Sequence, residues 1–155
     1  MFTLRLVQLI EAHAEDLSQG LMKRVKASPH CKELLHKVPG EELKQRSREI
    51  YRNLSDWLLS KTESEIEERY LGVGMRRARQ GVPLSQVLWA VTLTKEYLWD
   101  CLKEGMLEEP LELLGEIELV HNLERFFDRA IYFAAVGYES AVRTEDARTH
   151  ATSAA

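Results

Sequence analysis

The stretch 70–105 constrains the fold of this chain most strongly, because it contains the signals for a helix, a corner and a second helix. The corner lies at residues 80–83. Gly81 suits the left-handed backbone that closes a helix, and Pro83 suits the first turn of the next one. Beyond the corner, apolar residues recur at helical intervals: Leu84, Val87, Leu88, Val91, Leu98 and Leu102. This spacing predicts a helix over 84–103 with one buried stripe.

Comparable signals mark helix ends elsewhere in the chain. Thr62 is followed three residues later by Glu65, the pattern of a capping box that starts a helix. Ser28 before Pro29 predicts a serine cap with proline in the first helical position. Together with apolar periodicity, these signals predict helices over 3–26, 30–37, 41–61, 63–80, 84–103 and 110–143.

The predicted fold is therefore all-α, a single-domain bundle of about six helices over residues 1–143. The final segment, 144–155, consists of small and polar residues without apolar periodicity. Such a segment is typical of a disordered tail or of the remnant of a linker.

The composition is that of a soluble globular domain. The chain has 155 residues, of which 45% are hydrophobic and 30% are charged. Its net charge of -4 gives no electrostatic reason to expect nucleic acid or an anionic membrane as a partner. No apolar run reaches the roughly eighteen residues that cross a bilayer, and the N-terminus lacks the pattern of a secretory signal. Cys31 and Cys101 lack metal-ligand spacing, so we expect a reduced, cytoplasmic setting.

A candidate ligand site lies around the corner. Gly72 and Gly74 fall inside the helix predicted over 63–80, where each costs about 1 kcal/mol relative to alanine. Close approach of another helix or of a ligand would compensate for that cost. Arginines just before the corner complement the negative end of a helix dipole, or bind an anion. The residues assigned to this small pocket are Gly72, Gly74, Arg77, Arg79 and Trp89.

A candidate dimer surface lies on the last predicted helix. This helix carries a second apolar row beside its main one, formed by Leu123, Phe126, Ala130 and Phe133. A helix with so wide an apolar side can face both its own core and a second subunit. The sequence therefore predicts a homodimer formed through this helix.

The sequence gives little support for catalysis. It has no nucleophile with an evident base partner and no phosphate loop, so we expect a non-enzymatic protein without a cofactor. An alternative is a haem- or metal-binding sensor that uses His121 or His13. Glu118 and His121 have the spacing of one half of a di-metal bundle site, and haem needs one axial histidine in an apolar pocket. His13 is not part of such a pair, because Ile10 stands three residues before it, and it lies on an apolar stripe where a core histidine is also expected.

The corner also carries a family resemblance. The residues that carry it are Tyr70-Leu71-Gly72, Ala78-Arg79-Gln80-Gly81, Pro83-Leu84 and Tyr97-Leu98-Trp99. In these the chain resembles the N-terminal helical domain of RsbRD-type co-antagonists of the RsbT switch kinase, and a related segment of PucR-like regulators. The residues 91–94 differ from the small and aromatic residues expected there. The resemblance implies an all-α input module, globin-like without haem in some relatives, that dimerises and signals to an output domain.

The expected function is that of a cytoplasmic sensory or regulatory module in stress-response regulation. It would dimerise and signal through helix contacts to an output domain or partner, of STAS or kinase type by resemblance. No STAS, kinase or DNA-binding sequence follows, so we expect either a piece of a longer protein or a module that acts alone. Besides the haem- or metal-binding sensor, a structural adaptor without a ligand stays open as an alternative.

Overall fold

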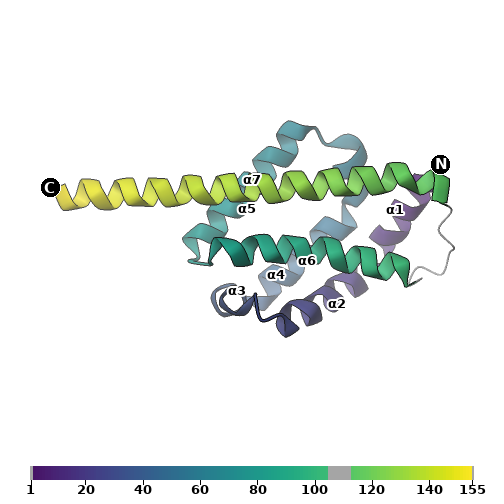
Figure 1. The fold of residues 1–155 in the computed structure, drawn as a ribbon, viewed down its shortest axis with the longest axis horizontal. Helices are drawn as coiled ribbons and strands as arrows, with labels where there is room; N and C mark the ends of the chain where they lie inside the picture. Colours follow the sequence, from purple (N-terminus) through teal and green to yellow (C-terminus); the bar gives the residue numbers. More distant parts are fainter. Residues whose placement is uncertain (1, 105–112, 155) are drawn as a thin grey trace.

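The computed structural model describes residues 2–104 and 113–154, which form helices joined by short turns (Figure 1). The prediction of an all-α bundle is confirmed, since no strand occurs in these two ranges. None of the helices in them is both long and apolar enough to cross a membrane. The helices are α1 (Phe2–Ala12), α2 (Ala14–Ala27), α3 (Lys32–Lys37), α4 (Gly40–Arg52), the π-helical turn η1 (Asp56–Ser60), α5 (Glu63–Arg79), α6 (Leu84–Lys103) and α7 (Leu113–Ala154).

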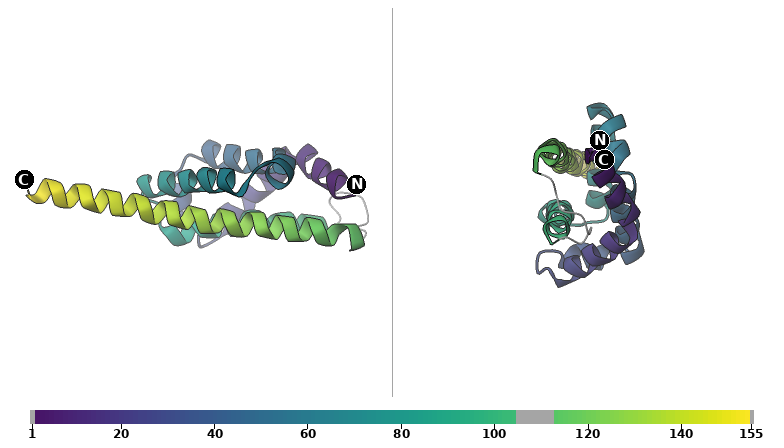
Figure 2. Two further views of the ribbon diagram at one scale, coloured as in Figure 1. Left: turned by 90° about the horizontal axis from the view of Figure 1, so that it is seen from above. Right: turned by 90° about the vertical axis from the view of Figure 1, so that its right-hand side faces the viewer.

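The helices pack in two layers around the core. Seen from the end, α6 and α7 lie on one side, and α1, α2 and α4 lie on the other (Figure 2). Within the first layer α6 and α7 run antiparallel (Figure 1). The most extensive contact in the described part of the molecule is between α5 and α7, while α2 packs between α4 and α6.

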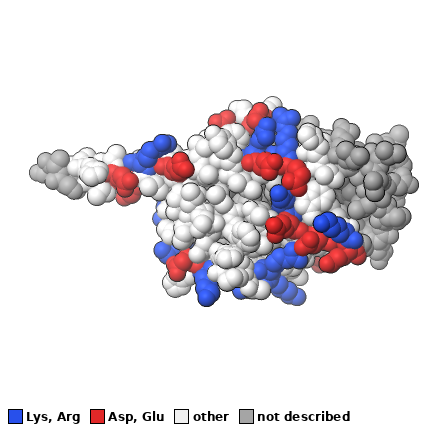
Figure 3. All heavy atoms as spheres, in the orientation of Figure 1, with Lys and Arg blue, Asp and Glu red and all other residues white. Residues whose placement is uncertain are grey.

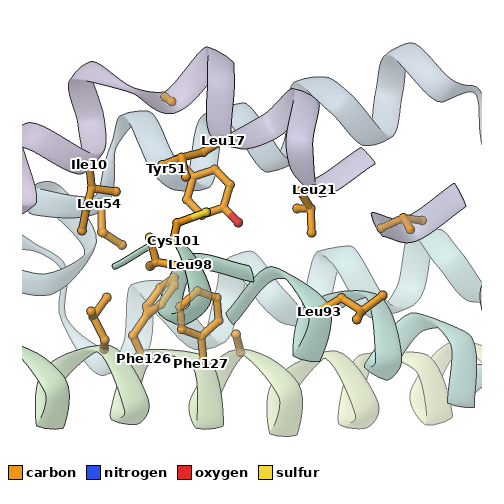
Figure 4. Close-up of a cluster of buried hydrophobic side chains, with 14 of the residues drawn as sticks. Ile10, Leu17, Leu21, Tyr51, Leu54, Leu93, Leu98, Cys101, Phe126 and Phe127 are labelled. Atoms are coloured by element: carbon orange, nitrogen blue, oxygen red, sulfur yellow. The ribbon is translucent and has the colours of Figure 1, made fainter. Parts of the chain in front are cut away.

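Aromatic and aliphatic side chains fill the space between the layers. Tyr51 of α4 is fully buried, and its hydroxyl donates a hydrogen bond to the Thr94 carbonyl at 2.9 Å. Figure 4 shows its ring beside Cys101 of α6, with Phe126 and Phe127 rising from α7. The two phenylalanine rings meet edge to face, with centroids 5.2 Å apart. Helices of both layers thus share one hydrophobic core.

The predicted signals around α5 are confirmed. The Thr62 hydroxyl accepts from the Glu65 N–H at 3.2 Å, and the Glu65 carboxylate accepts from the Thr62 N–H at 2.7 Å. These two bonds are the capping box that starts α5. At the corner Gly81 has a φ of 76°, the left-handed conformation that glycine adopts without strain. Pro83 occupies the N-cap of α6, one position before the first turn in which the sequence predicts it.

Two of the predicted helices are interrupted in the structure. The helix predicted over 3–26 breaks at His13, whose ring Nδ1–H donates to the Leu9 carbonyl at 2.9 Å. The ring competes for a carbonyl that the helix backbone also uses, and α1 ends there. The helix predicted over 41–61 is divided into α4 and η1.

The expected start of the second helix was also wrong. Here α3 begins at Lys32, and Cys31 occupies its N-cap without a side-chain cap. The Ser28 hydroxyl instead accepts hydrogen bonds from the His30 N–H and from the Trp89 indole N–H, both at 3.2 Å. Ser28 therefore ties the α2–α3 turn to α6 rather than capping α3.

The C-terminal segment is helical where the sequence predicts a disordered tail. Residues 144–154 continue α7, and the side chains of 144–151 are exposed. Once a packed helix exists, each added residue gains one backbone hydrogen bond, so an extension needs no apolar stripe. As a result α7 projects well beyond the body of the bundle (Figure 1).

The α5–α7 contact brings two backbones together at glycine. A Cβ added to Gly74 of α5 would overlap the carbonyl oxygen of Ala134, and one added to Gly137 of α7 would overlap that of Leu71. Only hydrogen atoms fit at these two positions. The glycine at position 74 therefore permits the close approach of another helix, one of the two explanations that the sequence offered. Gly72 is exposed and has no such role.

We expect Gly74→Ala to lower the free energy of unfolding by about 1–3 kcal/mol, because the added methyl group forces α7 away from α5. Gly72→Ala is the matched control, since a Cβ there has nothing within 4 Å. This control should raise the free energy of unfolding by up to about 1 kcal/mol through its better helix propensity. Urea denaturation of the two variants measures both effects. Effects of the same sign and size would contradict the close contact.

Candidate functional site

An apolar cavity of about 100 Å³ lies inside the bundle. Its walls come from α2, α3, α4, α5 and α6, because apolar side chains of each of these helices face the same space. The aliphatic side chains of the wall are Leu21, Met22, Val25, Leu34, Leu43, Ile50, Val73, Val87, Ala90 and Val91. The polar residues of the wall are Arg46, Ser47, Arg69, Tyr70, Arg77 and Thr94. The hydroxyls of Ser47 and Thr94 already bond to carbonyls of their own helices.

A second, basic hollow of about 410 Å³ adjoins the cavity between α4 and α5. We call it the arginine hollow, and its lining residues are Arg46, Glu68, Arg69, Gly72, Val73, Arg76, Arg77 and Arg79. Arg46, Arg69 and Arg77 line both spaces, as does Val73. The apolar cavity therefore leads directly to a set of guanidinium groups.

The innermost of these groups belongs to Arg77, which is only 5% exposed. Its Nη1 donates to Glu42 at 3.0 Å and to the side-chain oxygen of Gln80 at 2.7 Å. Arg76 also pairs with Glu42, with 2.6 Å between Nε and Oε1. Burial of Glu42 opposes ionisation, but the hydrogen bonds from Arg77 and Arg76 outweigh it and lower the pKa of this carboxyl. Glu42 thus fixes α4 to the end of α5.

The other arginines leave the hollow with surplus positive charge. Glu49 pairs with Arg69 at 3.0 Å and with Arg46 at 3.5 Å. Arg79 has no ion-pair partner among the described residues. Five guanidinium groups therefore face three carboxylates, those of Glu42, Glu49 and Glu68. An anion that enters the hollow meets a net positive field.

The structure brings only some of the predicted ligand residues together. Gly72, Arg77 and Arg79 line the arginine hollow. Gly74 faces α7 instead. Trp89 lies against the α2–α3 turn, with its ring edge-on to His30 at 5.2 Å between centroids. Whether any of these residues binds a ligand stays a prediction.

Arg46 and Arg69 line the hollow but are not among the pocket residues that the sequence predicts. A signal for Arg69 exists, since Arg69, Val73 and Arg76 are spaced by four and three residues and so share one face of α5. Nothing local in the sequence points to Arg46, which reaches the hollow from a different helix.

The residues predicted for the dimer surface lie in the core of the chain itself. Leu123 and Ala130 are 0% exposed and Phe126 is 3% exposed. Phe133 is half-buried and packs against the same core. The prediction is corrected here, because the second apolar row of α7 is covered by α5 and its neighbours, which bury it within one subunit.

The two histidines of the alternative sensor lie apart from the cavity. His13 is at the junction of α1 and α2, and His121 is exposed on α7. Glu118, the predicted partner of His121, has a side chain outside the described residues. Among the side chains that the structure describes, no group of three His, Cys, Asp or Glu is placed to hold a metal ion.

The fold and the cavity define a class of small all-α domains with an internal apolar space bordered by basic side chains. Residues 14–153 match the family described as the RsbT co-antagonist protein rsbRD N-terminal domain. The match covers most of the chain, so the chain belongs to this family, and the resemblance carried by the corner is confirmed. Membership places it among regulatory domains of stress-response systems. Comparisons with curated proteins and with solved structures gave no match.

The Glu42 pair has a testable pH dependence. The pKa of Glu42 is lower in the folded chain than its ordinary value of 4.5, so its stabilising effect is present above that value and is lost as the pH falls through the lowered pKa. We expect Glu42→Gln to lower the free energy of unfolding by about 2–3 kcal/mol at neutral pH. The difference from the unmodified chain should shrink as the pH falls below about 4.5.

Urea denaturation from pH 7 to the acid limit of folding measures this difference. Glu96→Gln is the control, because Glu96 is exposed and has no ion-pair partner among the described residues. It should change stability little at any pH. A Glu42→Gln effect that is as large in acid as at neutral pH would contradict the role given to the carboxylate.

Proposed function

We propose that this chain is a non-enzymatic regulatory input module that dimerises through α7. It passes its state through helix contacts to an output domain or partner, of STAS or kinase type. Family membership supports the regulatory role. The observation that carries the proposal is the distribution of exposed apolar surface. Among the described side chains, the large hydrophobic residues that remain exposed are Val120 at 40%, Tyr132 at 63% and Val142 at 41%, and all three belong to α7.

The position of these residues suits a lengthwise contact between two copies of α7. At about 100° per residue, Val120 and Val142 lie roughly 40° apart around the helix, and Tyr132 lies roughly 120° from Val120 and 80° from Val142, so the three residues span about a third of the circumference. Figure 3 shows an uncharged surface over the first part of α6 and the stretch of α7 beside it. Exposed apolar surface rimmed by polar residues is typical of protein–protein contacts. A partner helix along α7 would remove this surface from water.

The two ends of α7 differ in a way that suits transmission. Its middle is anchored in the core by residues such as Phe127 and Ala134, which are at most 1% exposed. Its C-terminal end is exposed and projects from the body. Because α5 and α7 touch backbone to backbone at Gly74 and Gly137, α7 cannot keep its place if α5 moves. A change inside the bundle is thereby carried to residues that a partner can contact.

We expect Tyr132→Glu to weaken the homodimer at least about tenfold, because it places a charge in an apolar contact. Gln19→Glu is the matched control, since it adds the same charge at an exposed position on α2. Native mass spectrometry and sedimentation equilibrium of the purified chain give the monomer–dimer ratio for each variant.

Three results would contradict the proposal in different ways. An unmodified chain that is monomeric at all concentrations removes the dimer. A dimer that tolerates Tyr132→Glu as well as Gln19→Glu removes α7 as its interface. A monomer that binds another protein directly through α7 would favour the adaptor over the dimeric input module.

A further inference from the structure

We propose that the apolar cavity and the arginine hollow together bind a small amphiphilic anion. The ligand class is a carboxylate that carries an acyl or aryl group of about six to eight carbons. Its apolar end occupies the cavity between α2 and α6, and its charged head lies among the guanidinium groups. The ligand's role as the input signal rests on the proposed function. The binding itself does not depend on that function and is measured separately.

The size of the cavity sets the size of the apolar group. An apolar cavity of about 150 Å³ stays dry and accepts a benzene ring. The cavity of about 100 Å³ therefore suits about four or five carbon atoms. The remaining carbons and the head group extend past Val73, which lines both spaces, into the arginine hollow. Longer chains do not fit without displacing the wall.

The head group is assigned from the charge at the mouth of the cavity. Arg46 and Arg69 line both spaces and share one carboxylate, that of Glu49. Arg79 adds a charge that no described carboxylate balances. Arginine side chains bind a planar carboxylate in bidentate fashion, which favours a carboxylic acid over an alcohol or an amine.

Tyr70 adds a polar group to the cavity wall. It lines the cavity and is 4% exposed. Burial raises the pKa of its hydroxyl, so this group stays protonated and is a donor. A ligand oxygen near Arg69, the residue before it on α5, is the kind of acceptor that this donor suits.

An inorganic anion or an acidic peptide would account for the arginines alone. Neither would account for a mostly aliphatic cavity that opens between those same arginines. An uncharged hydrocarbon would fill the cavity but leave the guanidinium groups in excess. The amphiphilic anion is the ligand that matches both halves of the site.

The site is also placed to act on α7. Val73 and Arg77 of α5 line both the cavity and the hollow, and Gly74 lies next to Val73 in the contact with α7. A ligand that presses on this face of α5 therefore acts one residue away from the helix that we propose as the transmitter.

Octanoate is the probe for this site, and isothermal titration calorimetry of the full chain measures its binding. Acetate tests the head group alone, 1-octanol tests the apolar chain alone, and inorganic phosphate tests a simple anion. We expect octanoate to bind at least about tenfold more tightly than any of the three, because only it gains both apolar burial and charge pairing.

Two variants locate the site, and a third serves as the control. Arg69→Gln should weaken octanoate binding about tenfold by removing one charge-assisted contact. Ala90→Leu fills the cavity from α6 and should abolish binding while the chain stays folded. Arg52→Gln removes an exposed arginine of α4 that lines neither space, and it should leave binding unchanged. Circular dichroism and the urea midpoint confirm that each variant is folded.

Each remaining outcome decides against part or all of the proposal. No octanoate binding overturns it. Equal binding of 1-octanol removes the anionic head, and equal binding of acetate or phosphate reduces the site to an anion site. Sedimentation of the same samples separates the two proposals: an intact dimer without octanoate binding removes only the ligand, and octanoate binding to a monomer removes only the dimer.

Discussion

The close contact between α5 and α7 is the constraint on which the rest of the structure depends. At Gly74 and Gly137 the two helices meet without an intervening side chain, so their separation is set by backbone atoms. With that distance fixed, Phe126 and Phe127 of α7 fit between the layers, and the corner after α5 leads into α6, which also packs against α7. Side-chain packing tolerates small errors by changing rotamers, but a backbone contact does not. The bundle is therefore built around one crossing with little freedom.

Ion pairs at the end of α5 add a second link between helices of the bundle. The end of α5 carries several arginines, and among the described residues Glu42 of α4 is the carboxylate that pairs with the buried guanidinium of Arg77. This carboxylate holds the first turn of α4 against the last turn of α5. The arginines that it does not satisfy remain turned toward the hollow. The same cluster thus closes the bundle at one point and leaves it open to an anion at another.

The fold was largely predictable because its signals are local. The capping box at Thr62 and the turn at Gly81 are each encoded within a few residues, and both occur where the sequence places them. The break at His13 was not predictable, since it depends on one ring competing for the Leu9 carbonyl. The arginine hollow was predicted only in part. Arg79 belongs to the arginines just before the corner, which are visible in the sequence, whereas Arg46 comes from a different helix and reaches the hollow only in the folded chain. The apolar row through Phe126 was assigned to a second subunit, since periodicity identifies a buried face but not what buries it.

The length of α7 has a mechanical consequence. From Gly137 to Ala154 the helix extends for roughly 25 Å at about 1.5 Å per residue. It acts as a lever arm whose pivot is the glycine contact. A tilt of about 5° at that pivot displaces the far end by roughly 2 Å over such a length, which is comparable to the helix shifts that switch subunit interfaces. A tilt too small to disturb the packing near Gly74 thus produces, at the C-terminal end of α7, a displacement large enough to change the contacts of a bound partner.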